Sequence, residues 1–232
     1  MQQIGTIFWS SVGKKIVSAG TGLLLVLYVI AHLIGNLQLL RGDPVPFNEY
    51  AHFLESLGVF LFIIELALLA VFLFHILMGV MVWLDKLKAR PQGYIKTADA
   101  GDPSKKTWSS KNMIITGIIL AVFTTYHVIT FKYGPGVSKG YVTVINGVEM
   151  RDLYRLVVES FQNVYIMLGY VICMILLGFH LRHGFWSAFQ SLGVQHPRLV
   201  PIIYGVGYLL AFVLAIGFLF IPIYIYFTGG AA

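Results

Sequence analysis

The stretch IVSAGTGLLLVLYVIAHLIGNLQLL, residues 16–40, contains no Asp, Glu, Lys or Arg and holds one histidine, His32. A membrane-spanning helix needs about 20 predominantly apolar residues. The whole chain is 58% hydrophobic and only 11% charged, with a mean hydropathy of +0.81. The sequence predicts an all-α integral membrane protein, a single membrane domain over residues 1–232. Its five transmembrane helices form a bundle, with spans at about 14–40, 56–84, 112–131, 160–182 and 199–227.

The cysteine content and the charge exclude several other classes of protein. Cys173 is the only cysteine, so the chain forms no internal disulfide and no cysteine-ligated iron–sulfur cluster. The net charge of +6 reflects basic residues that follow the ends of the apolar segments. This distribution is typical of topology signals in a membrane protein. We expect membrane lipid as a partner, and no nucleic acid.

The distribution of Lys and Arg predicts the orientation of the chain. Most of the 16 basic residues lie within residues 1–15, 85–111 and 182–198. Basic residues are enriched on the cytoplasmic side of a membrane. We therefore expect a multi-pass protein of the bacterial cytoplasmic membrane, with the N-terminus in the cytoplasm and the C-terminus outside.

Several loops carry signals of local structure. In the first outer loop, Asn48 is placed to cap a short amphipathic helix before the second span. In the outer loop 132–159, Asn146-Gly147 lies between two β-branched runs, which is the pattern of a two-residue β-hairpin. A helical lead into the fourth span follows it. The sequence shows no internal repeat and no second soluble domain.

Four histidines lie one each in the first four spans, and they fall into two layers of depth. At about 1.5 Å per helical residue, His32 and His127 lie about 8–14 Å from the outer end, counted from Arg41 and Lys132. His75 and His180 lie about 30 Å from that end, counted from Glu55 and Glu159. Helices one and three therefore supply an outer pair and helices two and four an inner pair. The layers are separated by about 20 Å.

The pairing of these histidines predicts their chemistry. An ionisable residue at membrane depth is costly and marks a functional site. Two pairs predict bis-histidine ligation of two haems, which suits electron transfer because no iron position stays open. A single intramembrane histidine more often hydrogen-bonds a neighbouring helix, and this alternative applies to each one taken alone. Gly35, Gly79 and Gly178 would leave room for the macrocycles. The chain has no C-x-x-C-H motif, which predicts noncovalent haem b.

Two stretches carry a resemblance to a known family. GKKIVSAGTGLLLVLYVIAHLIGNLQLL (13–40) and HLRHGFWSAFQSLG (180–193) resemble the type-B, five-helix, dihaem cytochrome b anchor of succinate dehydrogenases and fumarate reductases (succinate:quinone oxidoreductase, complex II). The similarity extends over essentially the whole chain, including all four histidines. It implies a proximal haem b on His75 and His180 and a distal haem b on His32 and His127, the same pairs that depth predicts.

The resemblance also implies subunits that this chain does not encode. A flavoprotein with covalent FAD and an iron–sulfur protein would dock on the cytoplasmic side, and the complex can form higher oligomers. The loop 85–111 and the segment 183–198 would form the docking surface. Electrons would pass between the iron–sulfur subunit and membrane quinone, and a two-haem anchor implies menaquinone. The sequence leaves open the direction of the reaction. The complex would either oxidise succinate, as in the tricarboxylic acid cycle, or reduce fumarate.

Polar residues at the two membrane boundaries are candidates for further contacts. Propionates of the inner haem need cationic or hydroxyl partners, and the candidates are Lys14, Lys15, Ser18, Arg182, His183 and Ser187. For the basic residues, simple anchoring at the cytoplasmic face is the alternative. Quinone chemistry needs a proton-exchanging group near a haem, and the candidates are Glu49, Glu55 and Glu65. Glu65 is the only carboxylate deep inside a span. Glu49 is the nearest match to an acidic residue that serves menaquinol oxidation in similar fumarate reductases.

Two other functions fit parts of the pattern. One is a dihaem cytochrome b anchor of another respiratory enzyme, such as a hydrogenase or formate dehydrogenase, in which the histidines are usually distributed differently. The other is a haem-free transporter or proton channel with intramembrane histidines. A reduced-minus-oxidised optical spectrum separates a haem protein from a transporter.

Overall fold

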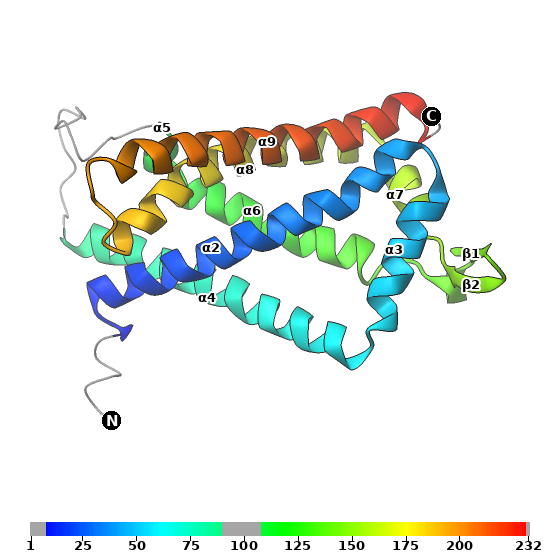
Figure 1. Ribbon diagram of the computed structural model, residues 1–232, viewed down its shortest axis with the longest axis horizontal. Coiled ribbons are helices and arrows are strands. Elements are labelled where there is room, and N and C mark those ends of the chain that lie inside the picture. The colour runs from blue at the N-terminus through cyan, green and yellow to red at the C-terminus, as the bar shows by residue number, and fades with distance from the viewer. Residues whose placement is uncertain (1–7, 90–107, 231–232) are drawn as a thin grey trace.

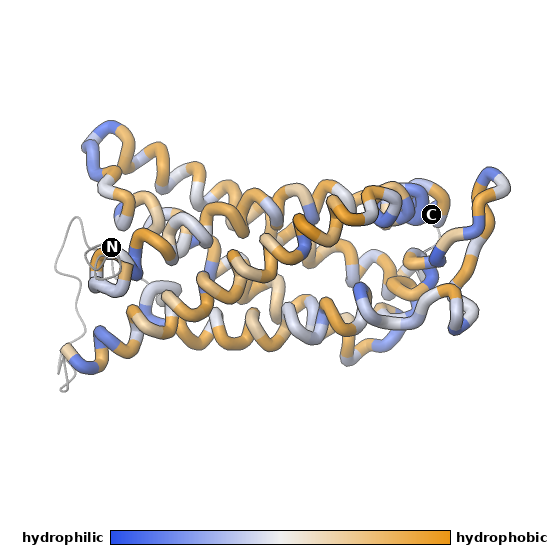
Figure 2. The backbone as a smooth tube through the Cα atoms, turned by 90° about the horizontal axis from the view of Figure 1, so that it is seen from below, coloured by the Kyte–Doolittle hydropathy of each residue, from blue (hydrophilic) through white to orange (hydrophobic). Residues whose placement is uncertain are grey.

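The computed structural model describes residues 8–89 and 108–230, and within these ranges five helices are long and apolar enough to cross a membrane. Figure 1 shows them running along the length of the molecule, and Figure 2 shows that hydrophobic residues dominate their middle while hydrophilic stretches gather at both ends. The protein is thus a multi-pass membrane protein, and the structure confirms the five predicted spans. The spans are α2 (Ser11–Asn36, extended by the 3-10 helix η1, Leu37–Arg41), α4 (Val59–Ala89), α6 (Met113–Phe131), α8 (Val164–Ser191) and α9 (Leu199–Thr228).

Two spans end later than the sequence predicted. Helix α4 continues to Ala89 instead of ending at Leu84, and α8 continues to Ser191 instead of Leu181 or Arg182. Charged residues mark the end of an apolar segment, but they do not break the helix, so both helices continue past their apolar segments. Within the predicted contact loop 85–111, residues 90–107 lie outside the described part of the chain. The short helix α5 (Trp108–Lys111) follows them.

The helices α8 and α9 pack side by side, and α2 crosses them to reach α4 (Figure 1). Small residues permit these close contacts, since a Cβ atom on Gly178 of α8 would lie 2.9 Å from Ala215 Cβ of α9. The start of α2 and the end of α4 lie together, and we call this the inner end after the predicted orientation. Helix α3 (Pro44–Ser56), the hairpin and α7 (Leu153–Phe161) form the outer end.

The predicted β-hairpin is present at the outer end. Strands β1 (Val142–Ile145) and β2 (Val148–Arg151) pair antiparallel. Asn146 and Gly147 both have positive φ, 53° and 78°, as a two-residue type I′ turn requires. The hairpin leads into α7, so the predicted helical entry is also confirmed, although the chain bends before α8 begins.

Asn48 has a different place from the predicted one. Helix α3 begins earlier, because the Asp43 side chain accepts a hydrogen bond from Val45 N–H and Pro44 occupies the first turn. Asn48 is therefore inside the helix and fully buried. Its Nδ2 donates to Asp152 Oδ1 and its Oδ1 accepts from Tyr154 N–H, both at 2.9 Å. The amide of Asn48 thus joins α3 to the start of α7.

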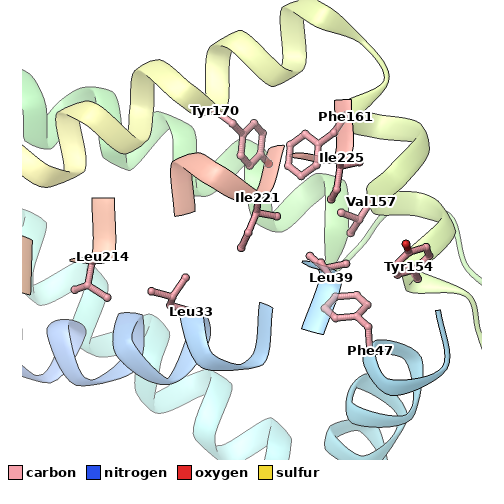
Figure 3. Packing of buried hydrophobic residues seen from close by; sticks show 10 residues of the cluster. All are labelled: Leu33, Leu39, Phe47, Tyr154, Val157, Phe161, Tyr170, Leu214, Ile221 and Ile225. Carbon is pink, nitrogen blue, oxygen red and sulfur yellow. The ribbon is translucent and has the colours of Figure 1, made fainter. Parts of the chain in front are cut away.

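The main hydrophobic core also lies at the outer end, where α2, η1, α3, α7, α8 and α9 meet (Figure 3). Tyr154 extends this core by donating a hydrogen bond to the Gly230 carbonyl. By contrast, Met78 is the one buried residue of α4. The outer end therefore holds the bundle together while α4 is loosely packed. The core residues are Leu33, Leu39, Phe47, Tyr154, Val157, Phe161, Tyr170, Leu214, Ile221 and Ile225.

Replacing Asn48 by Ala should destabilise the outer end. The substitution leaves the buried Tyr154 N–H without its partner, at a cost of about 1–3 kcal/mol. It also removes one of the two hydrogen bonds that Asp152 Oδ1 accepts, the other coming from Arg155 N–H. Thermal unfolding of the protein in detergent should show a lower midpoint. Ser56→Ala in the same helix is the matched control, because the exposed Ser56 hydroxyl donates to the Phe53 carbonyl of its own helix. Equal midpoints for the two variants would contradict the role of Asn48.

Candidate cofactor site

A large cavity lies between α2, α4, α6 and α8, and all four intramembrane histidines line it. Its volume is about 1630 Å³. Pockets for a single drug-sized ligand usually measure about 300–1,000 Å³. The cavity therefore has room for more than one such ligand, and it explains why α4 makes so few buried contacts.

The histidines face one another in the two pairs expected from depth. The ring centroids of His32 and His127 lie 5.7 Å apart with their planes at 87°, and those of His75 and His180 lie 6.3 Å apart at 74°. With metal–nitrogen bonds of about 2 Å, two imidazoles on opposite sides of one metal have centroids about 6 Å apart. The spacing of each pair would allow its two imidazoles to bind one metal ion between them.

The two layers are closer together than the sequence suggested. The His75 ring lies against Gly22 of α2 and the His180 ring against Gly117 of α6. Each glycine is ten residues from the outer histidine of its own helix, which places the layers about 15 Å apart at 1.5 Å per residue. The predicted value of about 20 Å was too large. It counted an unbroken helix from Glu55 and Glu159, whereas these residues belong to the separate helices α3 and α7.

Hydrogen bonds determine which nitrogen of each inner imidazole is available. His75 Nδ1 lies 3.1 Å from the Ser18 carbonyl, which can only accept, so this nitrogen carries the proton. His180 Nδ1 lies 3.1 Å from Thr116 Oγ1. The Thr116 hydroxyl proton is directed to the carbonyls of Asn112 and Met113, so its oxygen accepts from His180. In both rings Nε2 therefore keeps its lone pair, which is the form that binds a metal.

The outer imidazoles have mainly aromatic neighbours. Tyr170 from the hydrophobic core places its hydroxyl 3.2 Å from His127 Nδ1. Tyr28 stacks on His32 at 5.5 Å between centroids, and Phe123 lies 5.9 Å from His127 at a tilt of 32°. The core at the outer end thus also orients an imidazole of the outer pair.

Of the six predicted propionate contacts, four line the cavity: Lys15, Ser18, His183 and Ser187. The other two point elsewhere. Lys14 pairs with Asp85 of α4 at 2.7 Å. The Arg182 guanidinium donates to the Tyr208 hydroxyl of α9 at 2.5 Å and covers that ring at 4.5 Å. Both residues are one or two positions from a cavity-lining neighbour, and the 3.6-residue helical period turns them to another face.

Lys86 and Lys111 also line the inner end of the cavity, and sequence reasoning did not single them out. Lys86 follows His75 by eleven residues, which is about three helical turns and returns the side chain to the same face. That spacing is a signal by which Lys86 could have been found. With Lys15, these residues make the inner mouth of the cavity strongly basic.

The three candidate glutamates have different surroundings. Glu65 is not isolated in the membrane, because it pairs with Lys132 at the end of α6 at 2.5 Å. Glu55 and Glu65 both line the cavity at its outer mouth. Glu49 does not line the cavity, and its carboxylate accepts a hydrogen bond from Asn146 Nδ2 at the hairpin turn at 3.1 Å. The structure thus separates Glu49 from the site that the other two share.

Arg151 at the end of β2 also lines the outer mouth. Its Nε and Nη1 donate to the carbonyls of Pro135 and Lys132, while Nη2 is buried without a partner among the residues that the structure describes. Burial lowers the pKa of the guanidinium, and the negative charge of Glu55 opposes that shift. A buried donor without a partner is costly, so this position suits the oxygen of an anionic or carbonyl ligand.

Of the three glycines predicted to leave room for macrocycles, Gly79 lines the cavity, and Gly35 and Gly178 do not. Gly35 faces Tyr50 and Gly178 faces Ala215, whereas Gly79 lines the cavity with open space before it. Gly22 and Gly117 instead lie against the inner rings. Each of these two glycines follows a threonine and precedes the outer histidine of its helix by ten residues. That shared spacing is the signal by which they could have been found in the sequence.

Comparisons with protein-family models, with curated proteins and with solved structures find no match for this chain.

Enlarging Gly22 should disturb the inner pair. A Cβ at this position would lie 3.0 Å from His75 Cε1, so Gly22→Val forces the ring out of place. If the inner pair holds a haem, as the sequence predicts, the purified variant should lose it, measured as haem per chain. Gly20→Val in the same helix is the control, since nothing lies within 4 Å of a Cβ there. A full haem complement in Gly22→Val would refute the close contact.

Proposed function

We propose that this chain is the cytochrome b membrane anchor of a succinate:quinone oxidoreductase and that it binds two haems b. The observation that carries the proposal is the pair of crossed imidazoles in each of two layers of one cavity, at 5.7 and 6.3 Å. The haem irons would supply one-electron transfer between two oxidation states. The inner imidazoles, with protonated Nδ1 and free Nε2, are suited to hold an iron that has no open position.

The polar groups at the two ends of the cavity suit the propionates of the haems. Lys15, Lys86 and Lys111 supply positive charge at the inner mouth, and Ser187 supplies a hydroxyl. At the outer mouth, the unpartnered Nη2 of Arg151 suits a carboxylate, which accepts charge-assisted hydrogen bonds from a guanidinium.

The resemblance of residues 180–193 supports the identity of the partner subunits. This stretch continues α8 toward the inner end and ends near the basic mouth of the cavity. An iron–sulfur protein docked there, with its flavoprotein, would exchange electrons with the His75–His180 side. We place this face in the cytoplasm of a bacterium because of its basic residues.

The quinone would react at the opposite mouth, near His32 and His127. Glu55 and Glu65 line that mouth, and Glu65 is held by Lys132. Glu55 forms no ion pair among the described residues, and its carboxylate lines the cavity where a quinone would bind. We therefore favour Glu55 over Glu49 for this role, with menaquinone as the substrate.

Single histidine substitutions test the pairing of the ligands. His75→Ala and His180→Ala should remove the same haem, and His32→Ala and His127→Ala should remove the other, because both ligands of a pair hold one iron. The haem that remains is identified by its optical spectrum and midpoint potential in purified protein. Loss of one and the same haem in His32→Ala and His75→Ala would refute the pairing.

Substitutions of the glutamates test the quinone site. In the assembled complex, Glu55→Gln should lower succinate:quinone activity by about 100-fold or more, the usual contribution of a general acid or base. Both haems and the reduction of artificial dyes by succinate should persist. Glu49→Gln is the matched control, because its carboxylate bonds the hairpin turn, and it should retain most activity. If Glu49→Gln loses activity while Glu55→Gln does not, the proton exchange belongs to Glu49.

A further inference from the structure

The chain contains two copies of one sequence pattern, which the sequence analysis did not recognise. Residues 21–32 read TGLLLVLYVIAH and residues 116–127 read TGIILAVFTTYH. Both segments start with Thr-Gly, have leucine at the fifth position and an aromatic residue at the eighth, and end in the outer histidine. A second segment follows each copy, FHILMG at 74–79 and FHLRHG at 179–184, and contains the inner histidine.

The two copies make equivalent contacts in the structure. Thr21 Oγ1 lies 3.4 Å from His75 Nδ1, and Thr116 Oγ1 lies 3.1 Å from His180 Nδ1. The glycine after each threonine lies against Cε1 of the same ring. Each copy therefore provides one outer imidazole, one inner imidazole and a Thr-Gly step that contacts the inner one.

Both threonine hydroxyls are arranged to accept from an imidazole. Thr21 directs its proton to the Val17 carbonyl at 2.7 Å, and Thr116 directs its own to the Asn112 and Met113 carbonyls. The remaining lone pairs of each oxygen are free to receive Nδ1–H. An acceptor at Nδ1 makes the imidazole more basic and fixes its orientation as a metal ligand.

We propose that Thr21 and Thr116 are positioning residues that hold the inner imidazoles in the Nδ1–H form and lower the reduction potential of the iron between them. This inference rests on the proposed function, since it needs a haem between His75 and His180. A more basic ligand stabilises iron(III) relative to iron(II), so removing the acceptor raises the midpoint potential of the inner haem alone.

The two sites should differ in sensitivity. Thr116 is buried, and its hydroxyl is the contact of His180 Nδ1. His75 Nδ1, however, has the Ser18 carbonyl as a second acceptor at 3.1 Å. Loss of the Thr116 hydroxyl should therefore raise the potential more than loss of the Thr21 hydroxyl.

The test uses Thr116→Val, which keeps the shape of the side chain and removes the hydroxyl. In the purified full chain, each haem is followed optically while the ambient potential is varied. We expect the ratio of iron(II) to iron(III) in the inner haem, at a given potential, to rise by up to about tenfold, which corresponds to about 59 mV. Thr21→Val should give a smaller rise, and Thr116→Ser should restore the wild-type value. Thr125→Val is the control, because the exposed Thr125 hydroxyl donates to the Ala121 carbonyl of its own helix.

The outcomes separate this inference from the proposed function. Wild-type protein without haem would overturn both. Two haems with unchanged potentials in Thr116→Val, or a shift equal to that of Thr125→Val, would overturn the inference alone. If Thr116→Val does not retain its inner haem, Thr21→Val provides the test instead. An unchanged midpoint potential of the inner haem in Thr21→Val would then overturn the inference.

Discussion

The structure depends on the burial of imidazole rings inside an apolar bundle. A buried polar group without a partner costs about 1–3 kcal/mol, and the interior of a membrane offers no water to satisfy it. For three of the four rings the bundle itself provides a hydrogen-bond partner. A carbonyl and two threonine hydroxyls form hydrogen bonds with the inner rings, and the Tyr170 hydroxyl forms one with His127. Because each partner comes from a neighbouring helix, these contacts determine which helices must lie side by side and at what height.

The same arrangement explains why stability is distributed unevenly. The hydrophobic core and the Asn48 amide join α2, α3, α7 and α9 at the outer end. Around the histidines, α4 is separated from α6 and α8 by the cavity instead of by interlocking side chains. A ligand that fills this space would bind the folded bundle and not the unfolded chain, and would therefore stabilise it. The loose packing of α4 and the facing histidine pairs thus have one cause, the cavity that both border.

The sequence predicts the features that follow from local composition and from the helical repeat. Run length gives the five spans, Asn146-Gly147 gives the hairpin, and counting along the helices gives two histidines in each layer. It does not predict which way a side chain faces near a boundary. Lys14 pairs with Asp85 and Arg182 covers Tyr208, although both stand beside residues that line the cavity. Nor does it show that Glu65 has Lys132 as a partner, because that pair joins two helices far apart in the chain. The repeated Thr-Gly step was readable in principle, but few positions are identical and its meaning appears only when the threonines meet the inner rings.

The central claim is that this one chain holds two irons, each between two imidazoles. It is tested most directly by the haem content of the purified protein together with its low-temperature electron paramagnetic resonance spectrum. We predict two noncovalent haems b per chain, both low-spin, as expected when two nitrogen ligands leave no open position. One haem per chain, no haem, or a high-spin signal from either iron would contradict it.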